Sequence, residues 1–250
     1  MKILHSTVKE IIAHPAILEE VKRSISDEGL AVIKGVAKPE IINDILEHLT
    51  DKMRLTEPAY QPLEKSCANF YRVNFEDSRS HIKGHFHQFN FFPWNTDQFN
   101  FFEEFKHIFA LKNLLNDLDA DKYMSGIDDD FIPKLSFQFY DSGKGYLERH
   151  QDPVGEHQFV VPILAMSQKG ADFDQGGLEV KLQNEWKIVD DNIDVGDLVL
   201  LRGDVPHGVE KIDPNKEFEL FSSGRWMGLF AINKLQGSNK IENSKTIETA

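Results

Sequence analysis

The chain has 250 residues and a mass of 28.7 kDa, which suits one large domain. Apolar residues make up 40% and charged residues 28% of the chain, so it can bury a substantial core and does not have the composition of a disordered polymer. Its net charge of −13 argues against a protein that binds duplex nucleic acid or an anionic membrane surface. The single cysteine, Cys67, excludes an internal disulfide and a thiolate cluster for zinc or iron–sulfur.

Nothing in the sequence indicates export or membrane insertion. No apolar stretch approaches the roughly 20 residues that a membrane-spanning helix needs. The first residues lack the apolar segment of a signal peptide, because Lys9 already interrupts them. We therefore expect a cytoplasmic protein, and the sequence does not indicate its oligomeric state.

The first half of the chain is predicted to be mainly helical. Apolar residues recur at helical spacing in three segments, which cover about residues 16–26, 39–49 and 97–118. The first helix should end near Gly29, and residues 30–36 then read as a short buried strand. Residues 55–96 hold many Phe, His, Asn and Pro without a clear period, so we expect mostly loop there.

From about residue 131 the pattern changes to short strands separated by Gly and Asp turns. The predicted strands cover residues 131–140, 157–166, 178–182, 186–189, 197–201 and 225–232. Helices followed by strands indicate an α+β protein with a jelly-roll C-terminal half. We expect one domain over residues 1–233, with a mainly helical part at 1–128 and the jelly-roll core at 129–233, followed by a mobile tail at 234–250.

The segment with the clearest chemistry is His150-Gln151-Asp152. In a strand, residues i and i+2 project from the same face, so this imidazole and this carboxylate can converge on one point. A second imidazole, His207, follows an apolar strand 55 residues later. Two histidines and one carboxylate on one face leave open positions on a metal, which suits non-haem Fe(II) and oxygen chemistry.

Arg225 lies in a later apolar strand, where a guanidinium needs an anionic partner. A dicarboxylate cosubstrate would supply one through a bidentate pair. A plainer interpretation makes His150 and Asp152 a surface pair, His207 a turn residue and Arg225 part of a structural salt bridge. The order of the motifs along the chain favours the metal site, because the chain's one His-x-Asp precedes a strand-borne histidine and then an arginine.

At these residues the sequence resembles the Fe(II)/2-oxoglutarate-dependent dioxygenase superfamily, over roughly residues 130–232. The segment that precedes the metal motif and the Gly-Gly turn are most similar to the prolyl-hydroxylase type. Residues 30–49 are more similar to phytanoyl-CoA-hydroxylase relatives. Two features depart from the prolyl-hydroxylase pattern: Tyr146 precedes His150 by four residues instead of three, and an arginine replaces the lysine anchor. The segments that carry the resemblance are Tyr140-Asp-Ser-Gly143-Lys-Gly-Tyr146, His150-Gln-Asp152, Gly176-Gly177-Leu178, Val195-Gly-Asp197-Leu-Val-Leu-Leu201, Pro206-His207-Gly208 and Arg225.

The resemblance implies a double-stranded β-helix, or jelly roll, with the N-terminal helices packed on it. It places Fe(II) on His150, Asp152 and His207, and the distal carboxylate of 2-oxoglutarate on Arg225. With O2 as co-reactant, such an enzyme hydroxylates an unactivated C–H and releases succinate and CO2. Further candidates for 2-oxoglutarate contacts are Tyr140, Tyr146 and Arg202.

The substrate is expected to be a small molecule, because the chain is compact and has no basic or extended binding arm. Candidate substrate contacts are polar residues beside aromatics, namely Tyr71, Arg72, Asn74 and His87. The sequence leaves open whether residues 81–95 line the pocket. A second histidine cluster, at His81, His85 and His87, contains a His-x-His pattern but lacks the glutamate that a cupin metal site would add, so a loop or a pocket wall is the better interpretation.

Three alternatives remain open from the sequence. One is hydroxylation of a protein or peptide side chain, such as proline. Another is a non-catalytic jelly-roll module that binds an anion. The third is a metal-dependent cupin isomerase, which would need neither oxygen nor 2-oxoglutarate. Fold alone does not decide between these chemistries.

Overall fold

The computed structural model describes residues 1–124, 130–155, 157–220, 222–235 and 243–247. Its helices are α1 (Val8–Ala13), α2 (Pro15–Glu28), α3 (Pro39–Leu55) and α4 (Phe101–Leu115), with one 3-10 turn, η1 (Val189–Asn192). Its strands are β1 (Lys2–Leu4), β2 (Leu30–Ile33), β3 (Phe70–Phe75), β4 (Gly84–Phe91), β5 (Phe131–Asp141), β6 (Tyr146–Gln151), β7 (Val160–Ala165), β8 (Gly177–Leu182), β9 (Glu185–Ile188), β10 (Leu198–Arg202), β11 (His207–Glu210), β12 (Gly224–Lys234) and β13 (Lys245–Thr246).

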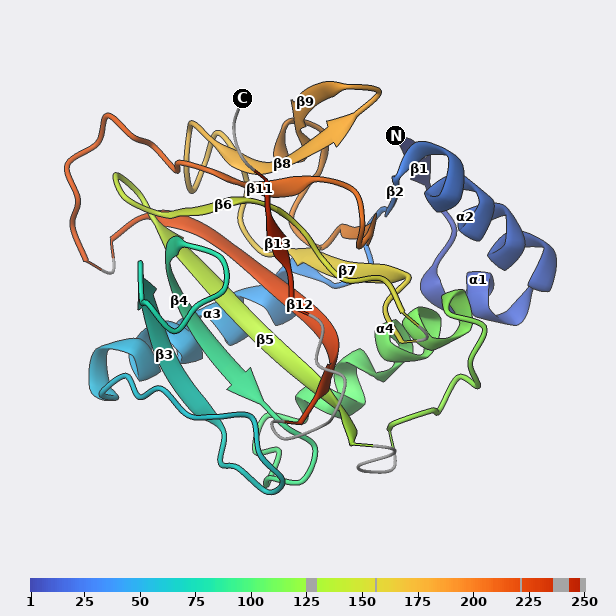
Figure 1. Cartoon of the computed structure of the whole chain (residues 1–250), viewed down its shortest axis with the longest axis horizontal. Helices are drawn as coiled ribbons and strands as arrows, with labels where there is room; N and C mark the ends of the chain where they lie inside the picture. The colour runs from blue at the N-terminus through green and yellow to red at the C-terminus, as the bar shows by residue number, and fades with distance from the viewer. Residues whose placement is uncertain (125–129, 156, 221, 236–242, 248–250) are drawn as a thin grey trace.

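The strands form one sheet that folds over on itself. Its order is β1-β2-β10-β7-β12-β5-β4-β6-β11-β8-β9, with β3 added on β4 and β13 on β6. The long strands β4, β5 and β12 belong to one layer, and β6, β11 and β8 run above them as a second layer (Figure 1). This is the expected jelly roll with N-terminal helices, so the predicted α+β fold class is confirmed.

Apolar side chains fill the space between the two layers. This interior cluster takes residues from both, such as Ile163 and Met227 from the long layer and Leu178 and Val180 from β8. Strand alternation sends the neighbouring residues of the long layer to its other face. There a larger cluster, with Phe137 of β5 among its members, packs the helices against the sheet. His150 and His207 lie on β6 and β11, in the second layer, whose inner face packs on the interior cluster.

The helices begin and end where their terminal residues predict. Pro39 occupies the first turn of α3, and the α2 helix stops at Gly29, which has a left-handed backbone. The Asp97 carboxylate accepts hydrogen bonds from the backbone N–H groups of Phe101 and Phe102, which start α4. Helix α1 and strand β1 were not expected from the sequence. None of the described helices is both long and apolar enough to cross a membrane.

The loop expected over residues 55–96 was partly wrong, because it contains strands β3 and β4. Seven of the eight residues of β4 are buried, on both faces of the sheet, so polar and apolar residues do not alternate in the usual way. Gln88 and Asn90, for example, are buried polar residues on the interior face. A strand that is covered on both sides lacks the period-2 pattern by which strands are recognised.

The tail predicted at residues 234–250 is described only in part. Residues 236–242 and 248–250 lie outside the described residues. Residues Lys245 and Thr246 form β13, which pairs antiparallel with Gln151 and His150 of β6. The described part of the tail therefore lies directly beside the metal-binding motif.

One close backbone approach gives a test of how the N-terminal segment is joined to the sheet. Gly196 has φ +92, and a Cβ there would lie 2.1 Å from the carbonyl oxygen of Ala37. Gly170 has φ +86 with no atom within 4 Å of its added Cβ. We expect Gly170→Ala to lower the free energy of unfolding by about 1 kcal/mol, the cost of the left-handed backbone. Gly196→Ala should cost about 3 kcal/mol or more, because it adds the clash.

Urea unfolding of the two variants measures the difference directly. Equal losses in both would contradict the close contact between Gly196 and Ala37.

Candidate metal centre

Two histidines face each other across neighbouring strands. His150 near the end of β6 pairs in register with His207 at the start of β11, and their ring centroids lie 4.2 Å apart. Both imidazoles are buried, with 5% and 6% of their residue surface exposed. Directly opposed residues of an antiparallel pair project to the same face, so the strand register itself brings the two rings together.

The orientation of each ring is set by a backbone carbonyl. The Nδ1 atom of His150 lies 2.8 Å from the carbonyl oxygen of Glu148, and that of His207 lies 2.9 Å from the carbonyl oxygen of Val205. A carbonyl can only accept, so each Nδ1 carries the proton and donates it. Each Nε2 is then left with its lone pair free for a metal ion.

Burial keeps the first of these rings neutral. It lowers the pKa of His150 to about 4, with the neighbouring His207 lowering it further and Asp152 opposing this. At neutral pH, His150 therefore does not have to lose a proton before it binds a cation.

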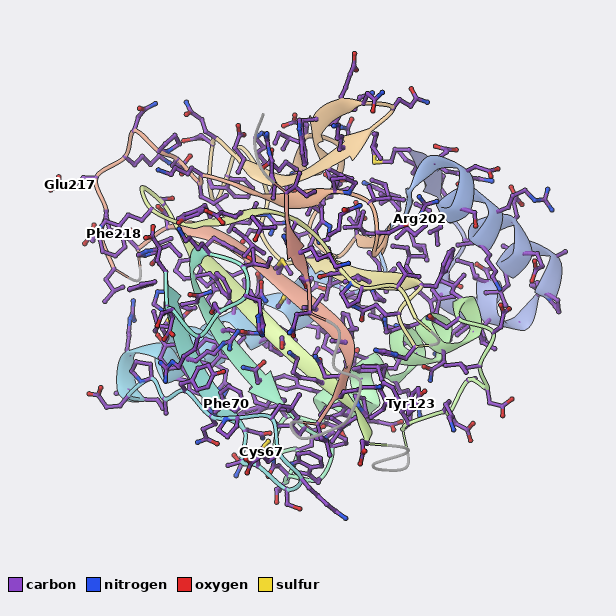
Figure 2. The ribbon with its side chains drawn as sticks, viewed as in Figure 1. Cys67, Phe70, Tyr123, Arg202, Glu217 and Phe218 are labelled. Atoms are coloured by element: carbon purple, nitrogen blue, oxygen red, sulfur yellow. The ribbon has the colours of Figure 1, made fainter. Side chains whose placement is uncertain are left out.

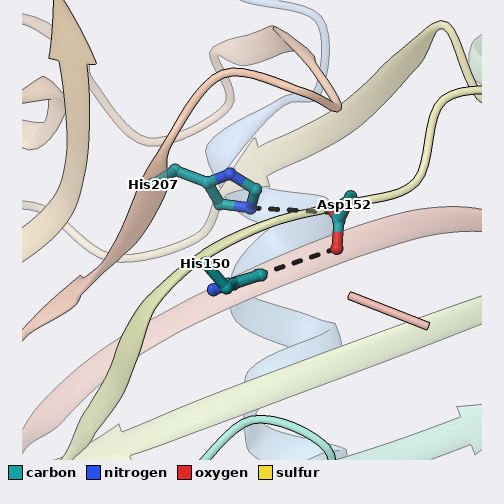
Figure 3. Close-up of side chains that lie close together, drawn as sticks. All are labelled: His150, Asp152 and His207. Carbon is teal, nitrogen blue, oxygen red and sulfur yellow. Dashed lines mark ion pairs between the residues drawn. The ribbon is translucent and has the colours of Figure 1, made fainter. Parts of the chain in front are cut away.

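Asp152 completes the group from just beyond β6. Its Oδ1 lies 3.7 Å from Nε2 of His150, and its Oδ2 lies 3.7 Å from Nε2 of His207 (Figure 3). Its backbone N–H donates to the carbonyl of Gly203 at 2.8 Å, which ties the residue to the turn after β10. Among the described residues, this is the one group of three such side chains whose ligand atoms all lie within 4.8 Å of one another.

The donor set fits ferrous iron. Two ligand atoms about 2.1 Å from one ion and at right angles to each other lie about 3 Å apart, which is slightly closer than the distances seen here. Two imidazoles and one carboxylate on the same side of an ion leave its other positions open. The residues present therefore match the group that the sequence predicts.

The hydroxyl of Ser244 contacts the metal-binding carboxylate from the C-terminal segment. Ser244 Oγ donates to Oδ1 of Asp152 at 2.5 Å, and the next residues form β13 on β6. The hydrogen bond holds the carboxylate in one orientation, as partners of metal ligands commonly do. The unpatterned tail gave no signal in the sequence for this contact.

A cavity of about 600 Å³ opens beside the candidate centre. Asp152 and Ser244 line it, together with Lys134 of β5 and Leu229 of β12. Within residues 81–95, which the sequence left open, His81 and Ile82 are among the lining residues. Its size is that of a site for a small organic molecule.

Arg225 is buried at the far end of β12, with 1% of its surface exposed. Its Nε donates to Oδ1 of Asp190 at 2.8 Å, and Oδ2 of Asp190 accepts from the backbone N–H of Leu178. A Cβ at Gly177, which has φ +122, would lie 2.8 Å from that carboxylate, so the Gly-Gly turn makes room for the pair. The Nη1 of Arg225 is buried without a hydrogen-bond partner among the described residues.

The other predicted cosubstrate contacts are spread widely. Tyr140 is fully buried opposite Arg225 in the β5–β12 register, and its hydroxyl donates to Gln138 at 2.6 Å. Tyr146 instead donates to Glu76 at an exposed site. Arg202 pairs with Asp204 at 2.6 Å and donates to the backbone of α2, beside which it lies in Figure 2. Of the three, Tyr140 alone lies in the interior with Arg225.

The four predicted substrate contacts lie on two different faces. Tyr71 and His87 share a hydrogen bond of 2.6 Å on the helix-covered face, where Asp141 contacts the other ring nitrogen at 3.0 Å. Asn74 is buried and accepts from a backbone N–H in the turn after β3. Arg72 lies on the interior face, where its Nε donates to Gln88 at 2.7 Å. The sheet thus separates Tyr71 and His87 from the cavity.

Sequence reasoning missed two cavity residues that carried a usable signal. Lys134 occupies an alternate position of the aromatic strand β5, on the same face as Tyr140, and a lysine in such a strand is rare. His157 follows the metal motif and lines the cavity. Burial lowers the pKa of His157 to about 4, and Lys112 and Lys234 lower it further.

The sequence was compared with known proteins at three levels. A scan against protein-family models and a search of curated proteins found no match. A prolyl-4-hydroxylase from Pseudomonas putida shares the structure at 16% identity and a TM-score of 0.51, over 88% of this chain and 100% of that chain. T7H from Neurospora crassa, in complex with alpha-KG and thymine, shares the structure at 13% identity and a TM-score of 0.54, over 98% of this chain and 93% of that chain.

JOX2, in complex with 2OG, Fe and JA, matches at 14% identity and a TM-score of 0.53, over 95% of this chain and 76% of that chain. The fold is that of the Fe(II)/2-oxoglutarate oxygenases. The resemblance noted in the sequence is thereby confirmed at the level of the fold.

The Ser244 contact predicts a measurable effect on metal binding. Ser244→Ala removes the hydrogen bond that orients Asp152, so the affinity for Mn(II), used as a stand-in for Fe(II), should fall by about tenfold. Calorimetric titration gives the dissociation constant. Ser222→Ala, which removes an exposed hydroxyl bonded to the backbone of Glu219, should leave it unchanged. Equal affinities in the wild type and Ser244→Ala would show that the contact does not support the metal ligand.

Proposed function

We propose that this protein is an Fe(II)/2-oxoglutarate-dependent oxygenase that hydroxylates a small molecule. The observation that carries the proposal is the group of His150, Asp152 and His207, whose ligand atoms lie within 4.8 Å of one another and of which Asp152 lines a cavity. The sequence motifs predict the same three residues. A structural ion pair would not need two imidazoles whose Nδ1 atoms are both tied to carbonyls.

The protein's own residues position the metal ion and the cosubstrate and enclose the substrate in the cavity. His150 and His207 present their Nε2 atoms, and Asp152 presents a carboxylate held by Ser244. When bound, iron with 2-oxoglutarate and O2 supplies the oxidation of an unactivated C–H bond, with succinate and CO2 as products. The carboxylate at position 152 occupies one coordination position, which favours hydroxylation over halide transfer. The apolar walls formed by residues such as Leu229 and Val161 limit the access of water.

Arg225 is the proposed partner of the distal carboxylate of 2-oxoglutarate. Its guanidinium uses Nε for Asp190 and keeps a buried Nη1 without a partner among the described residues. A buried donor without an acceptor is costly, and a bound carboxylate would satisfy it. Tyr140, buried opposite Arg225, is the proposed second contact.

A small molecule fits the cavity better than a folded protein surface does. The space of about 600 Å³ suits one small organic molecule in addition to the cosubstrate. The complex of T7H with thymine shows that a related fold accepts a small molecule of this kind. Hydroxylation of a peptide side chain is the competing proposal, and it is favoured only by the similarity to the prolyl-4-hydroxylase.

The first test concerns the metal ligands. His207→Ala and Asp152→Ala should each abolish binding of Mn(II) and with it the metal-dependent binding of 2-oxoglutarate, because each removes one of three ligands. Calorimetry in the absence of oxygen measures both constants. Succinate release in air, followed with a panel of metabolites and peptides, then tests the reaction and the substrate class. Retained metal-dependent binding in either variant would overturn the ligand assignment.

The second test separates Arg225 from Arg202. Replacing a buried guanidinium leaves Asp190 without its partner, so the paired variant Arg225→Gln with Asp190→Asn is the better choice. It should weaken 2-oxoglutarate binding to the Mn(II)-loaded protein by about tenfold or more, while Mn(II) binding is kept. Arg202→Gln is the matched control, because this half-buried arginine has its own partners, Asp204 and the backbone of α2. A loss with Arg202→Gln and none with the paired variant would reverse the assignment.

A further inference from the structure

Lys134 places a positive charge on the wall of the cavity. It lies on β5, where Leu135, Phe137 and Phe139 pack under the helices and the alternate positions face the interior. Lys134 and Asp152 line the same cavity. The other interior positions of β5 are Ser136, Gln138 and Tyr140, and none of them carries a full charge, so a lysine here requires an explanation.

The ammonium group of Lys134 forms no hydrogen bond or ion pair with a residue that the structure describes, whereas the buried Lys112 donates to the carbonyl of Val160. Burial lowers the pKa of Lys134 to about 8, and the nearby Arg72 lowers it further, while the charge of Asp152 opposes this. The protein therefore bears a cost for keeping this side chain charged at neutral pH, and an anion at the same place would remove that cost.

The described wall of the cavity offers Lys134 one carboxylate, and the candidate metal centre uses it. Among the described lining residues, Asp152 is the one carboxylate, and it belongs to the metal-binding group. His157 also lines the cavity and is neutral at pH 7, because its pKa is lowered to about 4. An ion held by Asp152 would engage this carboxylate and leave the ammonium group of Lys134 to another anion.

The proposed cosubstrate anchor is too far away to use the same anion. Arg225 pairs in register with Tyr140, whereas Lys134 pairs with Ala231. Six residues of extended strand separate Tyr140 from Lys134, which is about 20 Å. A five-carbon diacid is far shorter than that. Arg225 and Lys134 must therefore serve two different acid groups.

We propose that the primary substrate carries an acid group, a carboxylate or a phosphate, that forms an ion pair with Lys134. The inference rests on the proposed function and adds the class of substrate. The ion pair would hold the acid group against β5, on the wall that the cavity shares with Asp152. The positive charge of Arg72 would strengthen the attraction without contacting the anion.

Chemical labelling of Lys134 tests the pairing without a known substrate. The protein is loaded with Mn(II) and saturating 2-oxoglutarate and treated briefly with acetic anhydride, and the acetylation rate of each lysine is measured by mass spectrometry. Benzoate and methyl phosphate are the probes, and benzamide is the uncharged match for benzoate. At least one of the two anions should slow acetylation of Lys134 by about threefold or more, with no effect on the exposed Lys106.

Binding constants for the same probes provide the second measurement. Lys134→Gln should lower the affinity for the anion that protects Lys134 by about tenfold, and Lys134→Arg should retain most of the affinity of the wild type. Affinities for Mn(II) and 2-oxoglutarate should stay within about twofold of the wild type, which also shows that the variants are folded.

Three results would overturn the inference. Full protection of Lys134 by Mn(II) and 2-oxoglutarate alone would make it a cosubstrate contact. Equal protection by benzamide and benzoate would show that charge plays no part, and no protection by either anion would show that no acid group binds there. In all three cases the proposed function would stand, because it fails only if metal-dependent binding of 2-oxoglutarate is absent.

Discussion

The register between β6 and β11 is the constraint on which the candidate site depends. His150 and His207 lie 57 positions apart in the chain and meet only because these two strands pair with those residues opposite each other. A slip of one residue would turn one imidazole to the other face of the sheet. The register is supported from both sides, since β11 also pairs with β8 and β6 is bordered by β13. Backbone pairing, more than side-chain packing, therefore sets the metal geometry.

The interior of the folded sheet is divided along its length. One end is closed and holds Arg225 with Asp190 and Tyr140, all fully or almost fully buried. The other end is open and is lined by Lys134 and His157. Between them lie both apolar side chains, such as Met227, and the buried polar residues Ser136 and Gln138. The charged groups of the interior therefore stand near its two ends, where a ligand can satisfy them.

The sequence was sufficient to predict the parts of the structure that have a local signal. The helices were recognised by their period and by Gly29 and Pro39. The short His-x-Asp motif and a histidine after a core strand pointed to the three candidate ligands that the structure brings together. Strands β3 and β4 were missed because both faces of β4 are buried, which removes the alternation. The local sequence likewise does not show which face of the sheet a residue occupies. Tyr71 and Arg72 are neighbours in the chain, yet Tyr71 lies under the helices and Arg72 lies in the interior.

Some residues of the site could not be found from the sequence by any local rule. Ser244 belongs to a polar segment without a pattern, and its role comes only from the pairing of β13 with β6. Asp190 is one of several acidic residues in its region, and the structure alone shows that it is the partner of Arg225. Lys134 is different, because a single lysine in an aromatic strand can be recognised from the sequence as unusual.

The dispersal of the metal ligands has a thermodynamic consequence. His150 and His207 stand on strands that are adjacent only in the folded sheet, so the unfolded chain cannot offer the same three ligands to one ion. An ion that binds only the native state stabilises that state by mass action, by about 2.7 kcal/mol at a concentration one hundred times its dissociation constant. With the proposed ion bound, removal of that ion by a chelator would lower the stability of the fold as well as empty the site.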